Sequence, residues 1–384
     1  MSRFALDTVE RGRLNDLLAE LIRHPSPDPP GNEAAIAAFV GNYLESLGFA
    51  VTRDEFLPGR VNVMARLAGG GARPALVFSA HMDTMPVGDA GWTHPPFAAE
   101  VADGRLHGRG AADMKSGLAA MVWAAAKLKS TGVALAGDVV LAFSAGESTG
   151  CIGAKRMVET GALRDAGWLL VSEPTSLDVL TAEAGALWLN AVATGATGHA
   201  SGGGGDNAIA KLLGFIARLE GLELAAAPHP LLGMPSIAVN GLDAGSAPNI
   251  TPDRARATLD IRTLPGMNQA GVIAKLDEIA EIAGGAIGFE IIDAKPPVET
   301  DPADPFVATA CAATERITGK SARPGGVHYF SDSNVLVPAL NIPRVIIGPG
   351  QLGMSGRRDE WVALDDVAMA AAIYAEIAAE LLAG

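Results

Sequence analysis

Three short apolar segments, separated by predicted helices, constrain the fold of this chain more than any other feature. Residues 75–79, 138–143 and 168–171 are almost entirely apolar, which is typical of strands that are buried on both faces of a sheet. The segments between them, residues 115–129 and 151–159, are predicted to be helices. Strands that alternate with helices in this way indicate an α/β fold with a mostly parallel sheet.

A short polar cluster follows each of these three strands. The clusters are HMD, GES and SEPT, and they contain His81, Glu147 and Glu173. In open α/β sheets, ligands bind beyond the carboxyl ends of the strands, and those ends lie together at one edge. The sequence therefore predicts a functional site where these three clusters meet.

The pattern changes after residue 178. Short elements follow that are typical of a compact, open-faced α+β unit of ferredoxin-like type. They are strands at 187–194, 255–262 and 287–292 and helices at 207–219 and 269–283. The α/β pattern then resumes with a helix at 305–318, a buried strand at 344–347 and a closing helix at 364–382. We therefore predict a catalytic domain in two parts, residues 1–178 and 294–384, and an inserted domain at residues 179–293.

The composition limits the classes of function. With 29 basic and 43 acidic residues the formal net charge is −14, which disfavours binding to nucleic acid and to anionic membranes. The N-terminus has no apolar core of signal-peptide type, and no segment approaches the length of a membrane span. The two cysteines, Cys151 and Cys311, are expected to be reduced thiols. These features predict a cytoplasmic protein that binds neither nucleic acid nor membranes.

The first polar cluster offers metal-binding chemistry. His81 and Asp83 form an H-x-D pair, and His, Asp and Glu supply the nitrogen and oxygen ligands that bind zinc and similar divalent ions. Taken alone, such a pair is more often a hydrogen-bonded structural histidine. The His81–Asp83 pair alone therefore does not predict a metal site, and further evidence must come from other parts of the sequence.

The order and spacing of several blocks resemble a known family over almost the whole chain. The blocks are HMDTMPVGD, GWTHPPF, DGRLHGRGAADMKSG, FSAGESTGCIGA, SEPTS, GATGHASGGGGDNAI, PNITPDRARATLDIRTLPG and GPGQLGMSGRRDEWV. They resemble the metallohydrolases that include acetylornithine deacetylase, succinyl-diaminopimelate desuccinylase, aminoacylase and bacterial glutamate carboxypeptidase. The resemblance implies a catalytic domain of zinc-exopeptidase type, an inserted domain that acts in dimerisation or as a lid, and a homodimer joined through that domain.

The resemblance also implies a role for each matching residue. In the family two metal ions share an aspartate that matches Asp113, and one of these ions is also held by residues that match His81 and Glu173. Asp83 matches the carboxylate that orients the histidine, and Glu147 matches the general base.

Both remaining ligands of the other ion are missing, because Ser148 and Gly356 stand in their places. We therefore expect a mononuclear centre of His81, Asp113 and Glu173 that holds one divalent ion per chain, namely zinc, with manganese or cobalt as alternatives.

Further residues are candidates for substrate contacts. His199 matches a family histidine that reaches the developing oxyanion from a neighbouring subunit, although a solvated loop histidine is the alternative. Asn249 and Arg262 match positions that grip a substrate carboxylate, and Arg262 has the alternative of a strand-edge ion pair. His328 and Asp332 are expected near the substrate pocket, where either could bind substrate or replace a missing metal ligand.

We therefore expect a metal-dependent hydrolase of an amide bond in a small N-acyl amino acid, dipeptide or related carboxylated compound. Because the predicted site departs from the family, the scissile bond could instead be a carbamoyl, amidine or aryl-amine C–N bond. A binding protein that has lost catalysis is the third possibility. The presence of Glu147 beside a complete metal-ligand set argues against it, since an inactive site needs no base.

Overall fold

The computed structural model describes residues 2–89, 91–225 and 227–383. They pack as two compact units. Unit 1 contains the described residues up to Thr181, Glu299–Gly325 and those from Ser331 onward, and unit 2 contains Ala182–Val298 and Gly326–Phe330. The predicted domain limits 1–178, 179–293 and 294–384 remain a prediction, and the segment Gly326–Phe330 packs with unit 2 although it lies within the last of these ranges.

The large sheet has the strand order β1-β2-β6-β3-β7-β17-β8-β15, and β16 pairs with β8. Strands β6, β3, β7 and β17 are mutually parallel, whereas β1 and β2 are antiparallel to their neighbours. The expected α/β class with a mostly parallel central sheet is therefore confirmed. The strands in this order are Ala50–Leu57, Arg60–Leu67, Val139–Ser144, Ala75–His81, Ala166–Val171, Arg344–Ile346, Leu180–Glu183 and Val298–Glu299, with β16 at Gly325–Val327.

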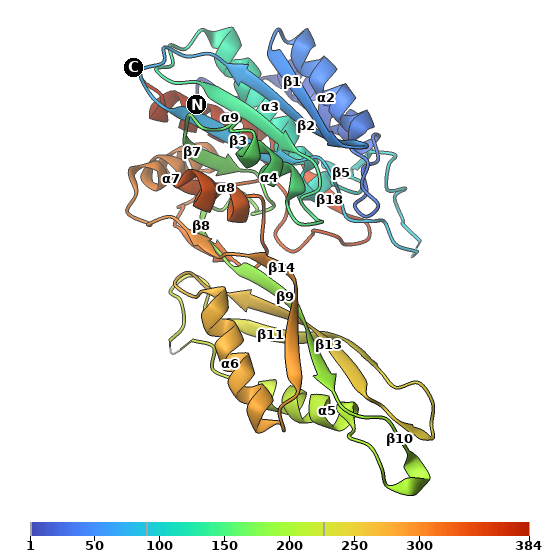
Figure 1. The fold of residues 1–384 in the computed structure, drawn as a ribbon. Helices are drawn as coiled ribbons and strands as arrows, with labels where there is room; N and C mark the ends of the chain where they lie inside the picture. The colour runs from blue at the N-terminus through green and yellow to red at the C-terminus, as the bar shows by residue number, and fades with distance from the viewer. Residues whose placement is uncertain (1, 90, 226, 384) are drawn as a thin grey trace. The chain divides into compact units, whose positions relative to one another are not determined.

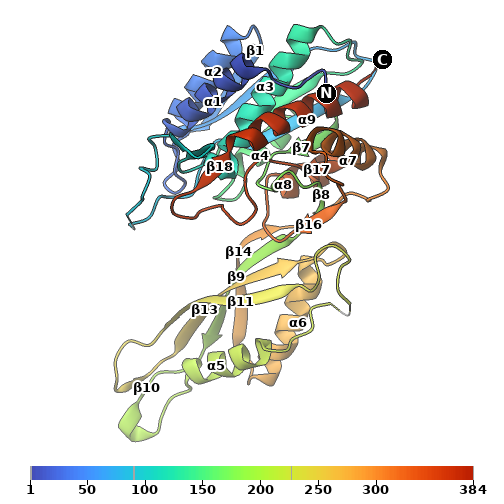
Figure 2. The same ribbon diagram turned by 180° about the vertical axis from the view of Figure 1, so that it is seen from behind.

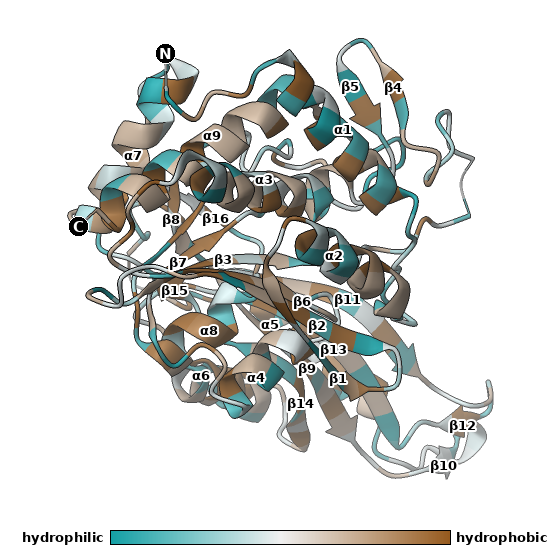
Figure 3. Cartoon of the chain, turned by 90° about the horizontal axis from the view of Figure 1, so that it is seen from above, coloured by the Kyte–Doolittle hydropathy of each residue, from teal (hydrophilic) through white to brown (hydrophobic). Residues whose placement is uncertain are grey.

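Helices cover both faces of the central strands, which explains why β3 and β6 are buried along their whole length. One face carries α1 (Thr8–Ile22), α2 (Ala34–Ser46), α3 (Ser116–Thr131), α7 (Pro305–Thr318) and α9 (Leu364–Leu381), and the other carries α4 (Ile152–Glu159) and α8 (Ser333–Leu340) (Figure 3). Figure 2 shows α9 beside α3. Both helices are rich in buried alanine, which permits their close approach. Within the described ranges, no helix is long and apolar enough to cross a bilayer.

A small three-stranded sheet, which the sequence did not predict, lies at the edge of unit 1. It pairs β4 (Glu100–Ala102) with β5 (Arg105–His107), and β5 with β18 (Trp361–Ala363). The β5–β18 pairing joins parts of the chain that are far apart in sequence. As a result, the loop of residues 351–360, which precedes β18, is fixed next to the segment that carries Asp113.

Unit 2 has the βαββαβ order of the predicted ferredoxin-like type, with one strand, β11, that the sequence does not predict. Its antiparallel sheet has the order β11-β13-β9-β14, formed by Ser236–Ala244, Arg254–Thr263, Gly185–Thr194 and Ile287–Lys295 (Figure 1). Helices α5 (Ala208–Leu219) and α6 (Gln269–Ile282) pack on one face through the apolar residues of β9 and β13. A separate two-stranded antiparallel sheet pairs β10 (Gly198–His199) with β12 (Ile250–Thr251).

Candidate metal centre

His81, Asp113 and Glu173 meet at the carboxyl edge of the central strands. His81 is the last residue of β3, Glu173 follows the end of β7, and Asp113 lies in the turn Ala111–Lys115 that leads into α3. Because β3 lies next to β7 in the parallel part of the sheet, the ends of the two strands are adjacent. One ligand atom from each of the three side chains lies within 4.8 Å of the other two. The predicted trio is thus assembled by the fold.

The trio is electrostatically unusual because it places two carboxylates around one buried imidazole. His81 Nε2 lies 3.1 Å from Asp113 Oδ1 and 3.7 Å from Glu173 Oε1. Burial alone would lower the pKa of His81, but Asp83, Asp113 and Glu173 together raise that pKa well above its usual range. The carboxylates give the site a surplus of negative charge that a divalent cation would neutralise. Together with the imidazole nitrogen they offer the oxygen and nitrogen donors that such a cation binds. The donor set therefore fits a metal ion such as Zn²⁺.

Asp83 supports the centre in a different way from the one expected. The backbone oxygen of Asp83, not its carboxylate, lies 2.9 Å from His81 Nδ1, and the nearest carboxylate oxygen is 3.7 Å away. With the proton on Nδ1, the ring donates to this carbonyl and turns Nε2 toward Asp113 and Glu173. The Asp83 carboxylate accepts the backbone N–H groups of Glu147, at 3.0 Å, and Ser148, at 3.1 Å. Asp83 therefore links the histidine to the loop that carries Glu147.

Glu147 lies in the loop after β6 and is 7% exposed. Its Oε1 atom is buried and has no hydrogen-bond partner among the residues that the structure describes. Burial raises the pKa of Glu147 well above its usual range, and the neighbouring Asp332 and Asp83 carboxyl groups add to the shift although His81 opposes it. A carboxylate with a raised pKa and an unused oxygen is suited to accepting and returning a proton.

Asp332 belongs to the surroundings of Glu147 and is not in the group of three ligands. It lies just before α8, is 3% exposed, and accepts a hydrogen bond from the Ser144 hydroxyl at the end of β6. Burial raises its pKa. Within the described ranges, His81, Asp113 and Glu173 form the one group of at least three His, Cys, Asp or Glu side chains that is close enough to hold an ion. Neither Asp332 nor His328 builds a second such group there.

Three residues around Asp113 had not been predicted from the sequence. The Ser355 hydroxyl donates to Asp113 Oδ2, Glu360 Oε1 accepts the N–H groups of Ala112 and Asp113, and Glu360 is paired with Arg109 at 2.7 Å. Burial opposes ionisation of Asp113, but hydrogen bonds from His81 and Ser355 lower its pKa. A partial signal for two of them was present, because Arg109 and Glu360 are charged residues inside the blocks DGRLHGRGAADMKSG and GPGQLGMSGRRDEWV.

The other predicted residues lie in unit 2. His199 and Asn249 meet beside the β10–β12 pairing, with Asn249 Nδ2 3.4 Å from His199 Nε2, while His199 Nδ1 lies 2.7 Å from the Ser201 hydroxyl. Arg262 pairs with Asp260 through Nε at 2.9 Å and donates from Nη1 to the backbone oxygen of His328 at 3.1 Å. The ion pair that was the alternative interpretation of Arg262 is therefore present.

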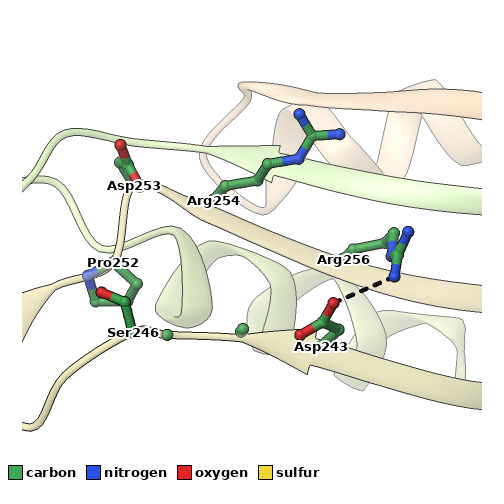
Figure 4. A pocket seen from close by; sticks show the side chains of 8 residues that line it. Asp243, Ser246, Pro252, Asp253, Arg254 and Arg256 are labelled. Carbon is green, nitrogen blue, oxygen red and sulfur yellow. Dashed lines mark hydrogen bonds and ion pairs between the residues drawn. The ribbon is translucent and has the colours of Figure 1, made fainter.

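Unit 2 also contains a pocket of about 370 Å³ at the ends of β11 and β13 (Figure 4). Two arginines line it, and both are engaged in ion pairs of 3.2 Å, Arg254 with Glu290 and Arg256 with Asp243. None of the predicted site residues lines this pocket.

Comparisons with known proteins identify the family to which the chain belongs. The sequence model of "Peptidase family M20/M25/M40" matches residues 77–380. The chain is 31% identical to succinyl-diaminopimelate desuccinylase of Parvibaculum lavamentivorans, covering 96% of this chain and 95% of the relative. It is 32% identical to the desuccinylase of Phenylobacterium zucineum, covering 99% of each chain.

Solved structures with the same fold include an aminopeptidase from Bacillus cereus, with a TM-score of 0.80 at 23% identity, covering 97% of this chain and 98% of the other. A Bacillus subtilis protein described as a dinuclear metal-binding peptidase has a TM-score of 0.75 at 18% identity, covering 98% and 99%. At these identities the structural similarity shows the fold alone. Membership of the family is shown by the sequence matches. The chain therefore belongs to peptidase family M20/M25/M40 and is a metal-dependent hydrolase of carbon–nitrogen bonds.

Proposed function

We propose that the chain hydrolyses the amide bond of a small N-acyl amino acid, dipeptide or related carboxylated compound with a single divalent ion held by His81, Asp113 and Glu173. The observation that carries this proposal is the convergence of the buried His81 and Glu173 and the partly buried Asp113 with Glu147 in the adjacent loop. Three protein ligands leave a position for water or substrate, as catalytic zinc sites require. Zinc is the proposed ion, and manganese and cobalt are the alternatives for the same donors.

The bound ion, Glu147 and Asp83 have different roles in the proposed reaction. A bound divalent ion would polarise the substrate carbonyl and lower the pKa of water. Glu147 takes a proton from the attacking water while the water oxygen bonds to the carbonyl carbon, and it gives that proton to the leaving nitrogen as the C–N bond breaks. The N–H groups of Glu147 and Ser148 are held by Asp83, so the base is kept in place by the residue that also orients His81.

A single ion is proposed because both side chains that would complete a second site are replaced. Ser148 follows Glu147 where the family resemblance implies a carboxylate, and Gly356 stands where it implies a histidine. The Bacillus subtilis structure is described as dinuclear, so this chain would differ from that relative in metal content. With one ion fewer, another donor must help to stabilise the oxyanion, and we assign that role to His199.

The substrate is proposed from the curated relatives and from the residues of unit 2. Because the similar proteins are named desuccinylases, N-succinyl and N-acetyl amino acids are the first compounds to test. We assign recognition of the substrate carboxylate to Asn249 and Arg262, with His328 and Asp332 as further substrate contacts. We also propose a cytoplasmic homodimer joined through the inserted domain.

The test is an activity screen of the zinc-loaded and manganese-loaded protein over N-acyl amino acids, dipeptides, carbamoyl compounds and amino-aromatics. Turnover of the first two classes supports the proposal, and turnover of the last two alone would identify the non-peptide alternative. Glu147→Gln should lose at least about 100-fold in kcat while it keeps its ion, because a neutral amide cannot accept the proton. Glu45→Gln, a change at an exposed glutamate, is the matched control and should be fully active.

Retained activity in Glu147→Gln would show that another group acts as the base. A protein that binds one ion but turns over none of these compounds would favour the binding-protein alternative.

A further inference from the structure

Glu360, at the end of the loop of residues 351–360, holds the two consecutive backbone N–H groups of Ala112 and Asp113. Glu360 Oε1 accepts the N–H of Ala112 at 2.9 Å and that of Asp113 at 3.0 Å. Its other oxygen pairs with Arg109 Nη1 at 2.7 Å, and both side chains are almost completely buried. This part of the loop therefore fixes the position of the Asp113 backbone.

Arg109 extends the same network to the middle of the loop. Its Nη1 donates to the backbone oxygen of Arg357, and its Nη2 donates to the backbone oxygens of Gly356 and Pro86, all at 3.1 Å. A buried guanidinium with this many acceptors has little freedom to move. The residues just before Glu360 are therefore held in one conformation, and Ser355 is the neighbour of this fixed segment.

The two carboxylate oxygens of Asp113 have different partners. Oδ1 lies 3.1 Å from His81 Nε2, inside the cluster of predicted ligands. Oδ2 accepts a hydrogen bond from the Ser355 hydroxyl. With its backbone held by Glu360 and its outer oxygen held by Ser355, the carboxylate has a single orientation.

We infer that Ser355 is a positioning residue that presents only Oδ1 of Asp113 to the metal ion and keeps Oδ2 engaged outside the ion's coordination. The inference rests on the proposed one-ion function, and it explains how Asp113 would serve one cation. A hydrogen bond to the outer oxygen of a ligating carboxylate orients that ligand and raises metal affinity.

The backbone conformation of Gly356, the residue after Ser355, is compatible with this role of Ser355. Gly356 has φ +70°, in the left-handed region that favours glycine. The nearest atom to a Cβ placed there would be Met85 Cγ at 3.7 Å, so space is available and the backbone conformation is the restriction. A side-chain ligand at position 356 would be strained, whereas the Ser355 hydroxyl reaches Asp113 without strain of this kind.

The test compares Mn²⁺ affinity, measured by competition with a fluorescent chelator, in the full-length chain and in two matched pairs of variants. The first pair is Ser355→Ala and Ser176→Ala, because the Ser176 hydroxyl also contacts the loop, at the N–H of Leu352, but does not touch Asp113. The second pair is Ser355→Thr and Ser355→Val, which have the same shape and differ in the hydroxyl. Thermal unfolding of the metal-free proteins is recorded in parallel.

We expect Ser355→Ala and Ser355→Val to bind Mn²⁺ about 10- to 100-fold more weakly, whereas Ser355→Thr and Ser176→Ala stay within about threefold of the parent chain. Metal-free unfolding should be nearly the same in all of them, since Ser355 is exposed. Equal Mn²⁺ affinity in the Thr and Val variants would overturn the inference, and so would an equal loss in Ser176→Ala. The parent chain tests the proposed function separately: electron paramagnetic resonance of bound Mn²⁺ should show one isolated ion per chain, and two coupled ions would contradict the one-ion centre itself.

Discussion

At the scale of single residues, Asp83 connects the two chemical parts of the site. Its backbone oxygen lies next to His81 Nδ1, and its carboxylate accepts the N–H groups of Glu147 and Ser148. The first contact depends only on the backbone, while the second depends on the side chain. Substitution of the Asp83 side chain should therefore disturb the position of Glu147 and leave the orientation of His81 unchanged.

Asp83→Ala removes the acceptor of two N–H groups and so releases the loop of Glu147. We expect kcat to fall about 10- to 100-fold while one ion stays bound, because the carbonyl contact to His81 remains. Asp83→Asn keeps an acceptor oxygen and should lose less activity. The measurement is kcat together with metal content by mass spectrometry. Loss of the ion along with activity would instead show that the carboxylate acts on the metal ligand.

Asp332 acts on Glu147 through charge. Because the Asp332 carboxyl raises the pKa of Glu147, Asp332→Asn should lower that pKa. A base with a lower pKa is deprotonated at a lower pH, so the acidic limb of the kcat/KM profile should move toward acid pH. The Ser144 hydroxyl can still donate to the amide oxygen of asparagine, so the fold should be kept. An acidic limb that does not move would show that it belongs to another group.

Local pattern predicts that three of the site residues meet, and the family resemblance adds Asp113. His81 ends a central strand and Glu147 and Glu173 follow two others, and parallel strands bring their carboxyl ends to one edge of the sheet. Ser355 is 242 residues from Asp113 and lies in a loop with no periodic pattern. Its contact arises from the β5–β18 pairing and the buried Arg109–Glu360 pair, and short strands and single ion pairs leave no periodic signal in the sequence.

At the scale of elements, burial decides which strands could be predicted. Strands β3 and β6 are buried on both faces and appear as apolar runs. The sequence does not predict β11, because it is an exposed edge strand whose sequence, SIAVNGLDA, contains Asn, Gly and Asp and does not alternate. The half-buried β13 does alternate and was predicted.

The start of α2 is joined to β2 by a charge cluster that makes stability depend on pH. Arg60 of β2 pairs with Glu33 at 2.7 Å and with Asp28 at 2.9 Å, and both carboxyl groups are fully buried. Two buried acids share one guanidinium, and burial raises the pKa of Glu33 from 4.5 to about 7 although Arg60 opposes the shift. The folded state therefore binds this proton more tightly than the unfolded state. The resulting stabilisation is complete below pH 4.5 and is lost as the pH rises through about 7.

Glu33→Gln removes this titration. Relative to the parent chain, the free energy of unfolding of the variant should increase by about 2 kcal/mol between pH 5 and pH 8. The measurement is urea unfolding at both pH values, read as the difference between variant and parent so that other titrating groups cancel. Glu45→Gln, at an exposed glutamate, should run parallel to the parent. If the Glu33→Gln difference is the same at both pH values, Glu33 does not carry the proton.

At the scale of the whole molecule, the chain consists of two units with different roles in the proposal. All three proposed metal ligands, the proposed base and the residues that orient them lie in unit 1. The sequence predicts an inserted domain because its pattern changes after residue 178 from apolar runs to shorter elements of α+β type. The return of the short segment Gly326–Phe330 to unit 2 was not predictable, since it depends on tertiary contacts such as that between Trp188 and Phe330.

Metal removal should therefore affect the two units unequally. An ion that binds only folded unit 1 stabilises that unit by about 4 kcal/mol when its free concentration is 1,000 times its dissociation constant. Treatment with a chelator should remove this stabilisation and speed amide hydrogen exchange in β3, in the turn Ala111–Lys115 and at the end of β7, which carry or precede the three ligands. Exchange in β9 and β13 of unit 2 should not change, because neither strand supplies a ligand. Equal acceleration in both units would mean that the ion stabilises the chain as a whole, and no acceleration in unit 1 would place the ion elsewhere.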